Sequence, residues 1–465
     1  MPQVTTLEDV YKMLSPEPLR TEQELNDYYR AELNEIRGGY RLQHLSLQLR
    51  RAFGSAPFKA FLMGHQGVGK STELSKLSQE IKNSFKTITL NATLDLDPTS
   101  FQPFDVLLLM LMEVAERTAQ SVDKGGAGSP PSDHRLREIL EWFSAVKITD
   151  EKKTEVGAQA EAGAGLSSDS LWAKALGLFG SLKGEMKYAS SRTTETVQYR
   201  LNQISALVKA ANRLLAECNE ILKKATGKEW LFVWEGFDRI GIIPPEKIEN
   251  LFLTYSTVLR ELDAHCIFTI PIDFGYAKTG QFSFPCLLIP DIPVFHKNHT
   301  PNMAGRKSLQ AILEARLVAD LFEPGQMMRL ITASGGNLRD LFTLVNSAAD
   351  NSLLSSKLKI GQDQVTDSII SLRSEYERRL GQHQPDKTEN PVTYAQQAER
   401  LLKIYNRDEA AEIADPVLTS LFRARAVLEF NGERWLGVHP LVVDILRKQG
   451  KIAPNAQGVA PGGTE

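Results

Sequence analysis

The stretch Gly64-His-Gln-Gly-Val-Gly-Lys-Ser-Thr72 decides which fold this chain adopts. It comes directly after Lys59–Met63, a short apolar run with the length of a buried strand. Residues 71–84 follow it with a helical pattern. A strand, a glycine-rich turn and a helix in this order form the opening unit of many α/β domains, so we predict that architecture here.

The same stretch fits the pattern G-x-x-x-x-G-K-[ST], which predicts a loop that wraps phosphate groups. Its glycines let backbone N–H groups turn inward, and the start of the helix adds partial positive charge. We expect Lys70 to reach the β- and γ-phosphates of a nucleotide and Ser71 to ligate Mg²⁺. The candidate nucleotide-binding residues are therefore Gly64, His65, Gln66, Gly67, Val68, Gly69, Lys70, Ser71 and Thr72.

A phosphate-binding loop needs carboxylates at the end of a neighbouring strand, and Leu231-Phe-Val-Trp-Glu235-Gly-Phe-Asp238 supplies them. Four apolar residues precede Glu235, which stands where a carboxylate can organise Mg²⁺. Asp238 is the second acidic group. One of the two can hold the metal shell while the other orients or deprotonates water. The alternative is a solvated strand end without a catalytic role.

Three further residues are candidates for sensing the nucleotide. Thr269 lies near the end of an apolar strand and can contact the γ-phosphate or position water, although it can equally be an ordinary strand residue. Asn337 can cap a helix in which Arg339 occupies the first turn, where the helix dipole disfavours a cation unless an anion lies nearby. Arg316 is a weaker candidate for a nucleotide or inter-subunit contact, and a surface or ion-pair role is the simpler expectation.

Strands and helices alternate along the first 295 residues, which predicts a parallel sheet. Besides Lys59–Met63, we expect strands over residues 85–90, 230–234, 265–270 and 286–289. Beyond Pro301 the pattern is helical. The helices expected there span residues 309–322, 327–333, 338–349 and 364–380.

Lys70 and Glu235 are 165 positions apart, which is more than a compact sheet of this type requires, so residues 120–220 look like an insertion. Helices are expected over residues 136–148 and 171–188. Residues 194–224 carry a heptad seam, which fits either a long helix packed on its own domain or a coiled coil with another subunit. The seam consists of Val197, Leu201, Ile204, Val208, Ala211, Leu215, Cys218 and Leu222.

Residues 394–451 combine helical segments with an alternating pattern around Asn431-Gly432, the strongest short signal for a hairpin. Helices plus a hairpin suggest a winged-helix-like module. This stretch contains nine Lys or Arg and eight Asp or Glu, which is a poor electrostatic footprint for DNA. We therefore favour a module that contacts protein.

The whole chain has 465 residues, with 54 Lys or Arg and 57 Asp or Glu, giving a formal net charge of −3. This balance excludes a globally basic nucleic-acid coat and a highly acidic disordered chain, but it allows a local basic patch. The three cysteines are sparse and not at metal-ligand spacing, which argues against a secreted disulfide framework. We see no signal peptide and no membrane span, and expect a cytoplasmic protein.

These motifs together resemble AAA+ and STAND-type P-loop ATPases over roughly residues 20–450. Trp234-Glu-Gly-Phe-Asp238 looks like the Walker B of STAND proteins, with Glu235 in place of the first Asp, and Ser334-Gly-Gly-Asn-Leu-Arg339 is similar to the sensor 2 turn of initiator-type AAA+ ATPases. The resemblance implies that Arg339 touches the γ-phosphate and that a winged helix follows the lid. Gly236 occupies the position of the AAA+ catalytic Glu, which favours a slow switch over rapid hydrolysis.

We therefore predict an ATP-binding, Mg²⁺-dependent switch that couples its nucleotide state to a protein partner or to self-assembly into a homo-oligomer. A nucleic-acid-associated ATPase and a nucleotide-binding scaffold without turnover are the alternatives. The expected units are an N-terminal helical segment (1–50), a P-loop core (51–295), a helical lid (296–385), a winged-helix-like module (392–452) and a disordered tail (453–465).

Overall fold

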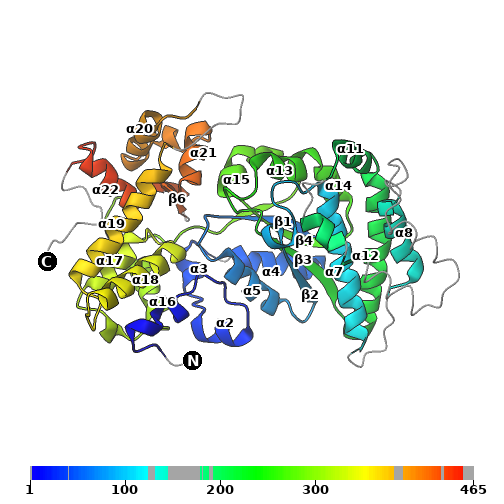
Figure 1. The fold of residues 1–465 in the computed structure, drawn as a ribbon, viewed down its shortest axis with the longest axis horizontal. Coiled ribbons are helices and arrows are strands. Elements are labelled where there is room, and N and C mark those ends of the chain that lie inside the picture. The colour runs from blue at the N-terminus through cyan, green and yellow to red at the C-terminus, as the bar shows by residue number, and fades with distance from the viewer. Residues whose placement is uncertain are drawn as a thin grey trace.

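A five-stranded sheet in which all neighbouring strands run parallel forms the centre of the molecule (Figure 1). Its strand order is β2-β3-β4-β1-β5, with β1 (Lys59–Met63), β2 (Phe85–Asn91), β3 (Glu229–Glu235), β4 (His265–Ile270) and β5 (Cys286–Leu288). The predicted parallel α/β sheet is confirmed. This computed structural model describes residues 3–39, 41–123, 131–144, 179–180, 182–187, 192–381, 391–430 and 434–453.

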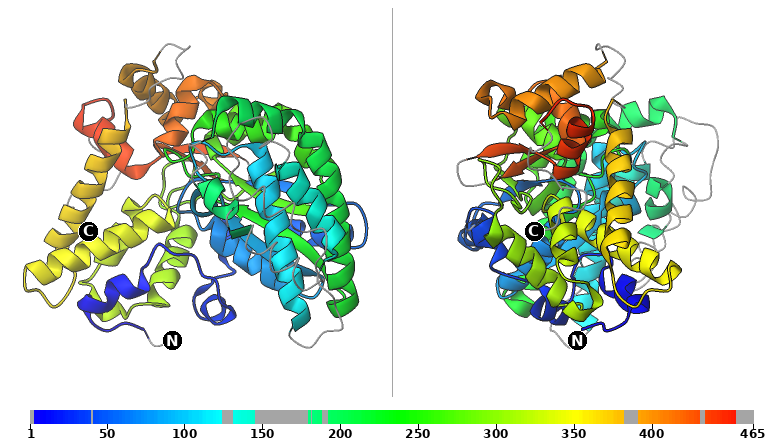
Figure 2. Two further views of the ribbon diagram at one scale, coloured as in Figure 1. Left: turned by 45° about the vertical axis from the view of Figure 1, so that its right-hand side comes forward. Right: turned by 90° about the vertical axis from the view of Figure 1, so that its left-hand side faces the viewer.

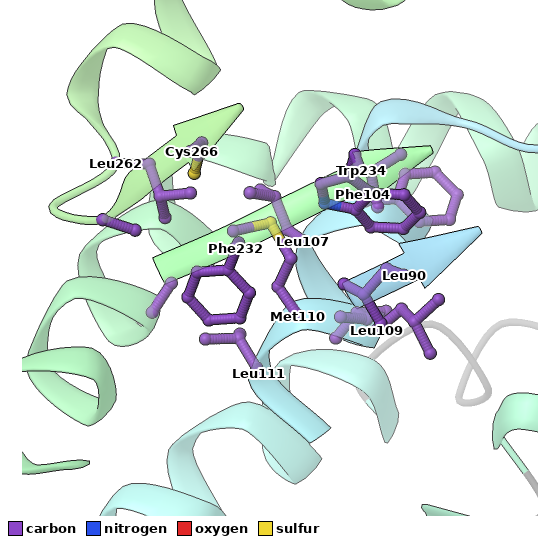
Figure 3. Packing of buried hydrophobic residues seen from close by; sticks show 14 of the residues in the cluster. Leu90, Phe104, Leu107, Leu109, Met110, Leu111, Phe232, Trp234, Leu262 and Cys266 are labelled. Carbon is purple, nitrogen blue, oxygen red and sulfur yellow. The ribbon is translucent and has the colours of Figure 1, made fainter. Parts of the chain in front are cut away.

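Strand β3 shows why the sheet has helices on both faces. Leu231 and Val233 pack into a cluster with α4 (Arg41–Ala52) and α5 (Lys70–Glu80). Trp230, Phe232 and Trp234 alternate with them and pack into the large cluster on the other face. Figure 3 shows Phe232 and Trp234 among side chains of α7 (Pro103–Asp123). Burial on both faces makes the strand almost continuously apolar, as in other parallel sheets.

The insertion packs its heptad seam on its own domain. The seam runs through two helices, α11 (Thr194–Asn202) and α12 (Ile204–Thr226), which are separated at Gln203. From Ile204 to Leu222 the seam residues are buried, and α12 lies against α7 and α8 (Asp133–Ser144). This part of the seam is therefore not free to form a coiled coil with another subunit. Most of the helix expected over residues 171–188 lies outside the described residues.

The remaining elements of the core connect its strands. They are α6 (Ala92–Asp95), α13 (Pro245–Glu249), η4 (Asn250–Thr254), α14 (Ser256–Glu261), α15 (Ile272–Lys278) and η5 (Thr279–Gln281).

The lid is helical, as predicted, and the N-terminal segment lies across it. Val4 N donates to the carbonyl of Arg316 at 2.8 Å, and Val318 N donates to the carbonyl of Val4 at 3.0 Å. Figure 1 shows this segment, in blue, passing from the lid to the core. The elements are η1 (Leu7–Asp9), α1 (Val10–Met13), α2 (Glu22–Tyr28) and α3 (Leu33–Ile36), and in the lid α16 (Met303–Glu314), η6 (Ala319–Leu321), α17 (Gln326–Ala333), α18 (Leu338–Leu354) and α19 (Gln362–Arg379).

The C-terminal unit has the predicted order of helices, antiparallel strand pair and helix. The tip of the hairpin, Asn431-Gly432, and the tail beyond residue 453 lie outside the described residues. Figure 2 shows this unit and the lid on the side of the core opposite the insertion helices. Its elements are α20 (Tyr394–Tyr405), η7 (Glu409–Glu412), α21 (Pro416–Arg423), β6 (Val427–Phe430), β7 (Trp435–Val438) and α22 (Pro440–Lys448). None of the described helices combines the length and the apolar character that crossing a bilayer requires.

Candidate functional site

The glycine-rich loop, residues 64–72, connects β1 to α5 and depends on its glycines. Gly64, Gly67 and Gly69 all have positive φ, of 155°, 91° and 97°. A Cβ on Gly67 would lie 2.4 Å from Asn337 Oδ1 and 2.5 Å from Arg339 Cβ. The loop thus needs glycine both for its backbone conformation and for the close approach of the lid.

Lys70 is buried at the start of α5, where its ammonium group meets three oxygens. Its Nζ donates to the carbonyls of Gly64 and His65 at 2.7 and 2.8 Å and lies 2.7 Å from Asp238 Oδ2. The charge of this lysine is therefore directed back into the concave side of its own loop. A phosphate oxygen entering the loop would find the cation already in place.

Asp238 joins three of the predicted residues. The hydroxyl of Thr269 donates to its Oδ1 at 3.2 Å, and the side-chain amide of Gln66 donates to its carbonyl at 3.1 Å. Burial by itself would raise the pKa of Asp238, but the charge of Lys70 and the hydrogen bonds that Lys70 and Thr269 donate to the carboxylate hold it below the ordinary value. Asp238 is thus kept as a carboxylate beside the loop.

Glu235, the predicted Mg²⁺-organising carboxylate, is paired with a residue that sequence reasoning missed. Arg20 Nη1 donates to Glu235 Oε1 at 2.8 Å, and Arg20 Nη2 donates to Oε2 at 2.7 Å. Glu235 is buried, whereas the side chain of Arg20 is 45% exposed. Just before Arg20, the backbone N–H of Leu19 donates to Thr72 Oγ1 at 3.3 Å. The N-terminal segment therefore lies over the first turn of α5.

The lid meets the glycine-rich loop through the turn that starts α18. Asn337 caps this helix as predicted, because its Oδ1 accepts from the backbone N–H groups of Arg339 and Asp340. Its Nδ2 donates to the carbonyl of Gln66 at 2.9 Å and to Asp291 Oδ1 at 3.0 Å. The backbone N–H of Arg339 also donates to the carbonyl of Gly67 at 3.3 Å.

The guanidinium of Arg339 makes no hydrogen bond or ion pair with any other described residue. Burial lowers its pKa, and the positive charges of Arg239 and Arg425 lower it further. Asp340, its neighbour in sequence, is instead bonded to Arg425 and Tyr376. Arg339 therefore stays available to an anion placed beside the loop.

The C-terminal unit also reaches the loop, which the sequence gave no reason to expect. Arg425 donates to the carbonyl of Gln66 at 3.3 Å and to Asp340 Oδ1 at 2.9 Å. The ring of Phe422 lies 5.8 Å from that of His65. Burial lowers the pKa of His65 to about 3, so this side chain is a neutral packing group at neutral pH.

Two other predicted residues complete the loop. Val68 is fully buried beneath it and packs in the cluster of α4 and α5. Ser71 is partly buried, and its hydroxyl makes no hydrogen bond within the described part of the chain. Its side chain thus retains a hydroxyl oxygen for a ligand.

A cavity of about 340 Å³ opens beside the loop. Gly69 and Thr72 contribute to it from the start of α5, Leu19 from the N-terminal segment, and Leu338 and Phe342 from the lid. A space of this size, with apolar walls, suits a nucleoside. It adjoins the point where the phosphates would lie.

The residues present fit a nucleoside triphosphate with Mg²⁺. The glycines form a cradle that a Cβ would obstruct, and Lys70 supplies the cation. The Ser71 hydroxyl and the carboxylates of Glu235 and Asp238 are oxygen ligands of the kind that Mg²⁺ prefers. Together they could hold the phosphates and the ion.

Comparisons with known proteins give only loose structural likenesses. No protein-family model matches the chain, and no curated protein matches it. ORC1 of Aeropyrum pernix, solved in complex with DNA, is 13% identical with a TM-score of 0.36, over 96% of this chain and 97% of that one. The RuvB Holliday junction branch migration motor of Thermotoga maritima is 10% identical with a TM-score of 0.36, over 95% and 100%.

A Walker-type ATPase of Pyrococcus abyssi is 12% identical with a TM-score of 0.39, over 94% of this chain and 99% of that one. At such identities and TM-scores, superposition does not assign a function. The function has to come from the residues of the site itself.

Proposed function

We propose that the protein binds ATP with Mg²⁺ between its core and its lid, and that slow hydrolysis switches its contacts, in the manner of AAA+ and STAND-type ATPases. One observation carries the proposal: Lys70, Asp238 and Thr269 form a continuous chain of contacts at the edge of the sheet where the glycine-rich loop begins. Residues from three different strand ends converge there, as phosphoryl transfer requires.

Lys70 neutralises the charge of the phosphates in this proposal. An entering β- or γ-phosphate competes with Asp238 for the ammonium group, which now lies 2.7 Å from that carboxylate. Asp238 is then free to orient or deprotonate a water molecule. Thr269 already donates to Asp238 and keeps the carboxylate facing the loop.

Ser71 and Glu235 are the residues that would hold the metal ion. Mg²⁺ would supply positive charge to the oxygens of the leaving phosphate. Arg20 occupies both oxygens of Glu235 in this conformation. Arg20 therefore has to move, or to share the carboxylate, before Glu235 can organise the ion.

Arg339 and the C-terminal unit provide the coupling. Arg339 would read the γ-phosphate from the lid, while Arg425 of the C-terminal unit contacts the same loop at Gln66. A change in the loop would therefore alter its contacts with both the lid and the C-terminal unit. A change in the lid angle would in turn alter the surface offered to a partner or to a second copy of the chain.

A nucleotide-binding scaffold without turnover is the second candidate, and one observation favours it. Both candidate catalytic carboxylates are paired with a cation, Glu235 with Arg20 and Asp238 with Lys70. Neither is free to accept a proton from water in this conformation. A protein that stays in this arrangement would bind nucleotide and not hydrolyse it.

Single-turnover release of phosphate from ATP separates the two candidates. Release that requires Mg²⁺ and is lost in Asp238→Asn supports hydrolysis, whereas ATP binding with no release supports the scaffold. Size analysis with a non-hydrolysable ATP analogue tests the switch, which predicts a change in assembly or in partner capture. Turnover stimulated by DNA, with a steep dependence on salt, would instead indicate a nucleic-acid-associated ATPase.

A further inference from the structure

The cavity beside the glycine-rich loop contains a buried cation that the phosphate chemistry does not use. Arg316 follows α16 in the lid and is only 6% exposed. It lines the cavity together with Gly69 and Thr72, so it lies beyond the phosphates on the nucleoside side. It was expected at the surface or in an ion pair, and the structure contradicts that expectation.

The surroundings of Arg316 leave its charge without an anionic partner. Its guanidinium lies over the ring of Tyr28 at 4.6 Å and over that of Phe342 at 5.6 Å, and its Nη1 donates to the carbonyl of Ile312 at 2.9 Å. No carboxylate of the described residues forms an ion pair with it. Burial lowers its pKa to about 10. A buried guanidinium with one bonded carbonyl retains donors for a ligand.

Tyr28 gives a second, independent sign of a missing partner. Its side chain is 7% exposed, and its hydroxyl is buried without a hydrogen-bond partner in the described part of the chain. Leaving such a group unpaired destabilises the protein unless a ligand accepts its hydrogen bond. Tyr28 lines the same cavity as Arg316.

The remaining lining indicates what kind of acceptor fits. Leu19, Leu33, Leu338 and Phe342 provide apolar walls suited to a flat ring. The carboxylates of Glu17, Glu24 and Glu73 also line the cavity and nearly balance its other cations, Lys12, Arg30 and Arg37, so the lining has no large excess of positive charge that would favour a second anion. A neutral heteroaromatic ring with acceptor nitrogens satisfies the donors and the walls together.

We propose that Arg316 and Tyr28 bind the nucleobase through its ring-nitrogen acceptors, so that a buried cation in the lid reads the base. This rests on the proposed function, because it places a nucleotide in the loop. For ATP the available acceptors are N1, N3 and N7 of adenine. The lid then recognises both ends of the nucleotide, with Arg316 at the base and Arg339 at the phosphates.

The test compares binding of ATP, of its 1-, 3- and 7-deaza analogues and of inorganic triphosphate by calorimetry. Hydrogen bonds to charged groups contribute about 1.5–3 kcal/mol, so Arg316→Met should weaken ATP about 10- to 100-fold. Arg316→Met should leave the affinity for inorganic triphosphate unchanged. The deaza analogue that lacks the contacted ring nitrogen should bind wild type more weakly than ATP does, by a similar factor. Arg316→Met should not weaken the binding of that analogue any further. Tyr28→Phe should weaken ATP several-fold.

Arg329→Met is the matched control, because Arg329 lies on α17, does not line the cavity and donates to Thr366 at 2.9 Å. It should bind ATP as wild type does. If Arg316→Met does not fold, the wild type alone decides the matter: equal binding of all three deaza analogues and ATP overturns the inference. So does normal ATP binding by a folded Arg316→Met. If the wild type binds neither ATP nor inorganic triphosphate, the proposed function itself has failed.

Discussion

Arg20 holds both carboxylate oxygens of Glu235, at 2.8 and 2.7 Å, although 215 residues separate the two in sequence. Bidentate pairing of this kind fixes the position of the carboxylate as well as its charge. The carboxylate that we propose organises Mg²⁺ is therefore already paired with the N-terminal segment.

The first prediction concerns this pair. Arg20→Ala should strengthen Mg²⁺-dependent ATP binding several-fold, because Mg²⁺ no longer has to displace the guanidinium of Arg20 from Glu235. Because the loss of Arg20 leaves the buried carboxylate of Glu235 without its partner, the variant should also lower the free energy of unfolding by about 1–3 kcal/mol. Calorimetric titration with and without Mg²⁺ measures the first effect, and urea unfolding measures the second.

Lys82→Ala serves as its control, because Lys82 pairs with Glu22 of the same N-terminal segment in an exposed contact of 3.2 Å. This variant should bind ATP as wild type does. Weaker Mg²⁺-dependent binding in Arg20→Ala would show that Arg20 assists the nucleotide site.

The second prediction concerns Lys70. Lys70→Ala should abolish ATP-induced stabilisation, which for wild type is about 2.7 kcal/mol at 100 times the dissociation constant. The variant also leaves Asp238 buried without its cation, so Lys70→Ala/Asp238→Asn should recover stability without recovering ATP binding. Thermal unfolding with and without ATP tests both statements.

Lys76→Ala is the control on the same helix, because its ammonium lies over the ring of Tyr29 at 5.5 Å. It should retain the full ATP effect. ATP binding by the Lys70 variants at wild-type strength would refute the assignment of the loop.

The third prediction concerns pH. Burial lowers the pKa of His65 to about 3 and that of His439 to about 4, below the ordinary value near 6.5. Between pH 6.5 and these values the unfolded chain binds more protons, so each histidine should reduce stability as the pH falls, by about 1.4 kcal/mol per pH unit. Urea unfolding at pH 5 and 6.5 should show a smaller difference for His65→Gln than for wild type.

Comparing variant with wild type removes opposing contributions, such as that of Asp291, whose pKa burial raises to about 6. His134→Gln is the control, because His134 is 73% exposed, and it should keep the wild-type difference. An unchanged pH dependence in His65→Gln would mean that folding does not shift the pKa of His65.

The fourth prediction concerns the contact between the C-terminal unit and the loop. Arg425→Ala removes the partner of the buried Asp340 and should destabilise the protein by about 3–5 kcal/mol. It should also expose the C-terminal unit to limited proteolysis in the absence of nucleotide. Lys403→Ala breaks an exposed pair with Glu399 on α20 and should do neither. Proteolysis at the wild-type rate would show that Arg425 does not hold the unit on the loop.

Local sequence patterns were enough to predict the sheet strands and most of the lid helices, whereas the helix predicted over residues 309–322 is α16, Met303–Glu314, followed by the short η6. Apolar runs and helical patterns report on neighbours along the chain, and the capping role of Asn337 is equally local. The contact between Thr269 and Asp238 was not predicted, although both residues lie at the ends of parallel strands, which meet at one edge of the sheet.

The contacts of Arg20, Arg316 and Arg425 could not be predicted in this way. Arg425 is 359 residues from Gln66, and an isolated arginine belongs to no repeating pattern that could indicate its partner. The heptad seam left two interpretations open, since the same spacing serves a helix buried in its own domain, which the structure shows, and a coiled coil. Its break at Gln203 depends on packing that the pattern does not record.

The backbone bridge between Val4 and Leu317 ties the beginning of the chain to the lid, whereas Arg20 ties it to the core. Leu7, Val10 and Leu14 are also buried against the lid, and Asn346 of the lid donates to the carbonyl of Leu14 at 3.1 Å. Only the residues between Leu14 and Arg20 therefore cross from the lid to the core, and they would act as a tether that limits how far the lid can move. A longer tether would let the lid move further from the core, and a shorter one would hold the lid closed over a ligand in the glycine-rich loop.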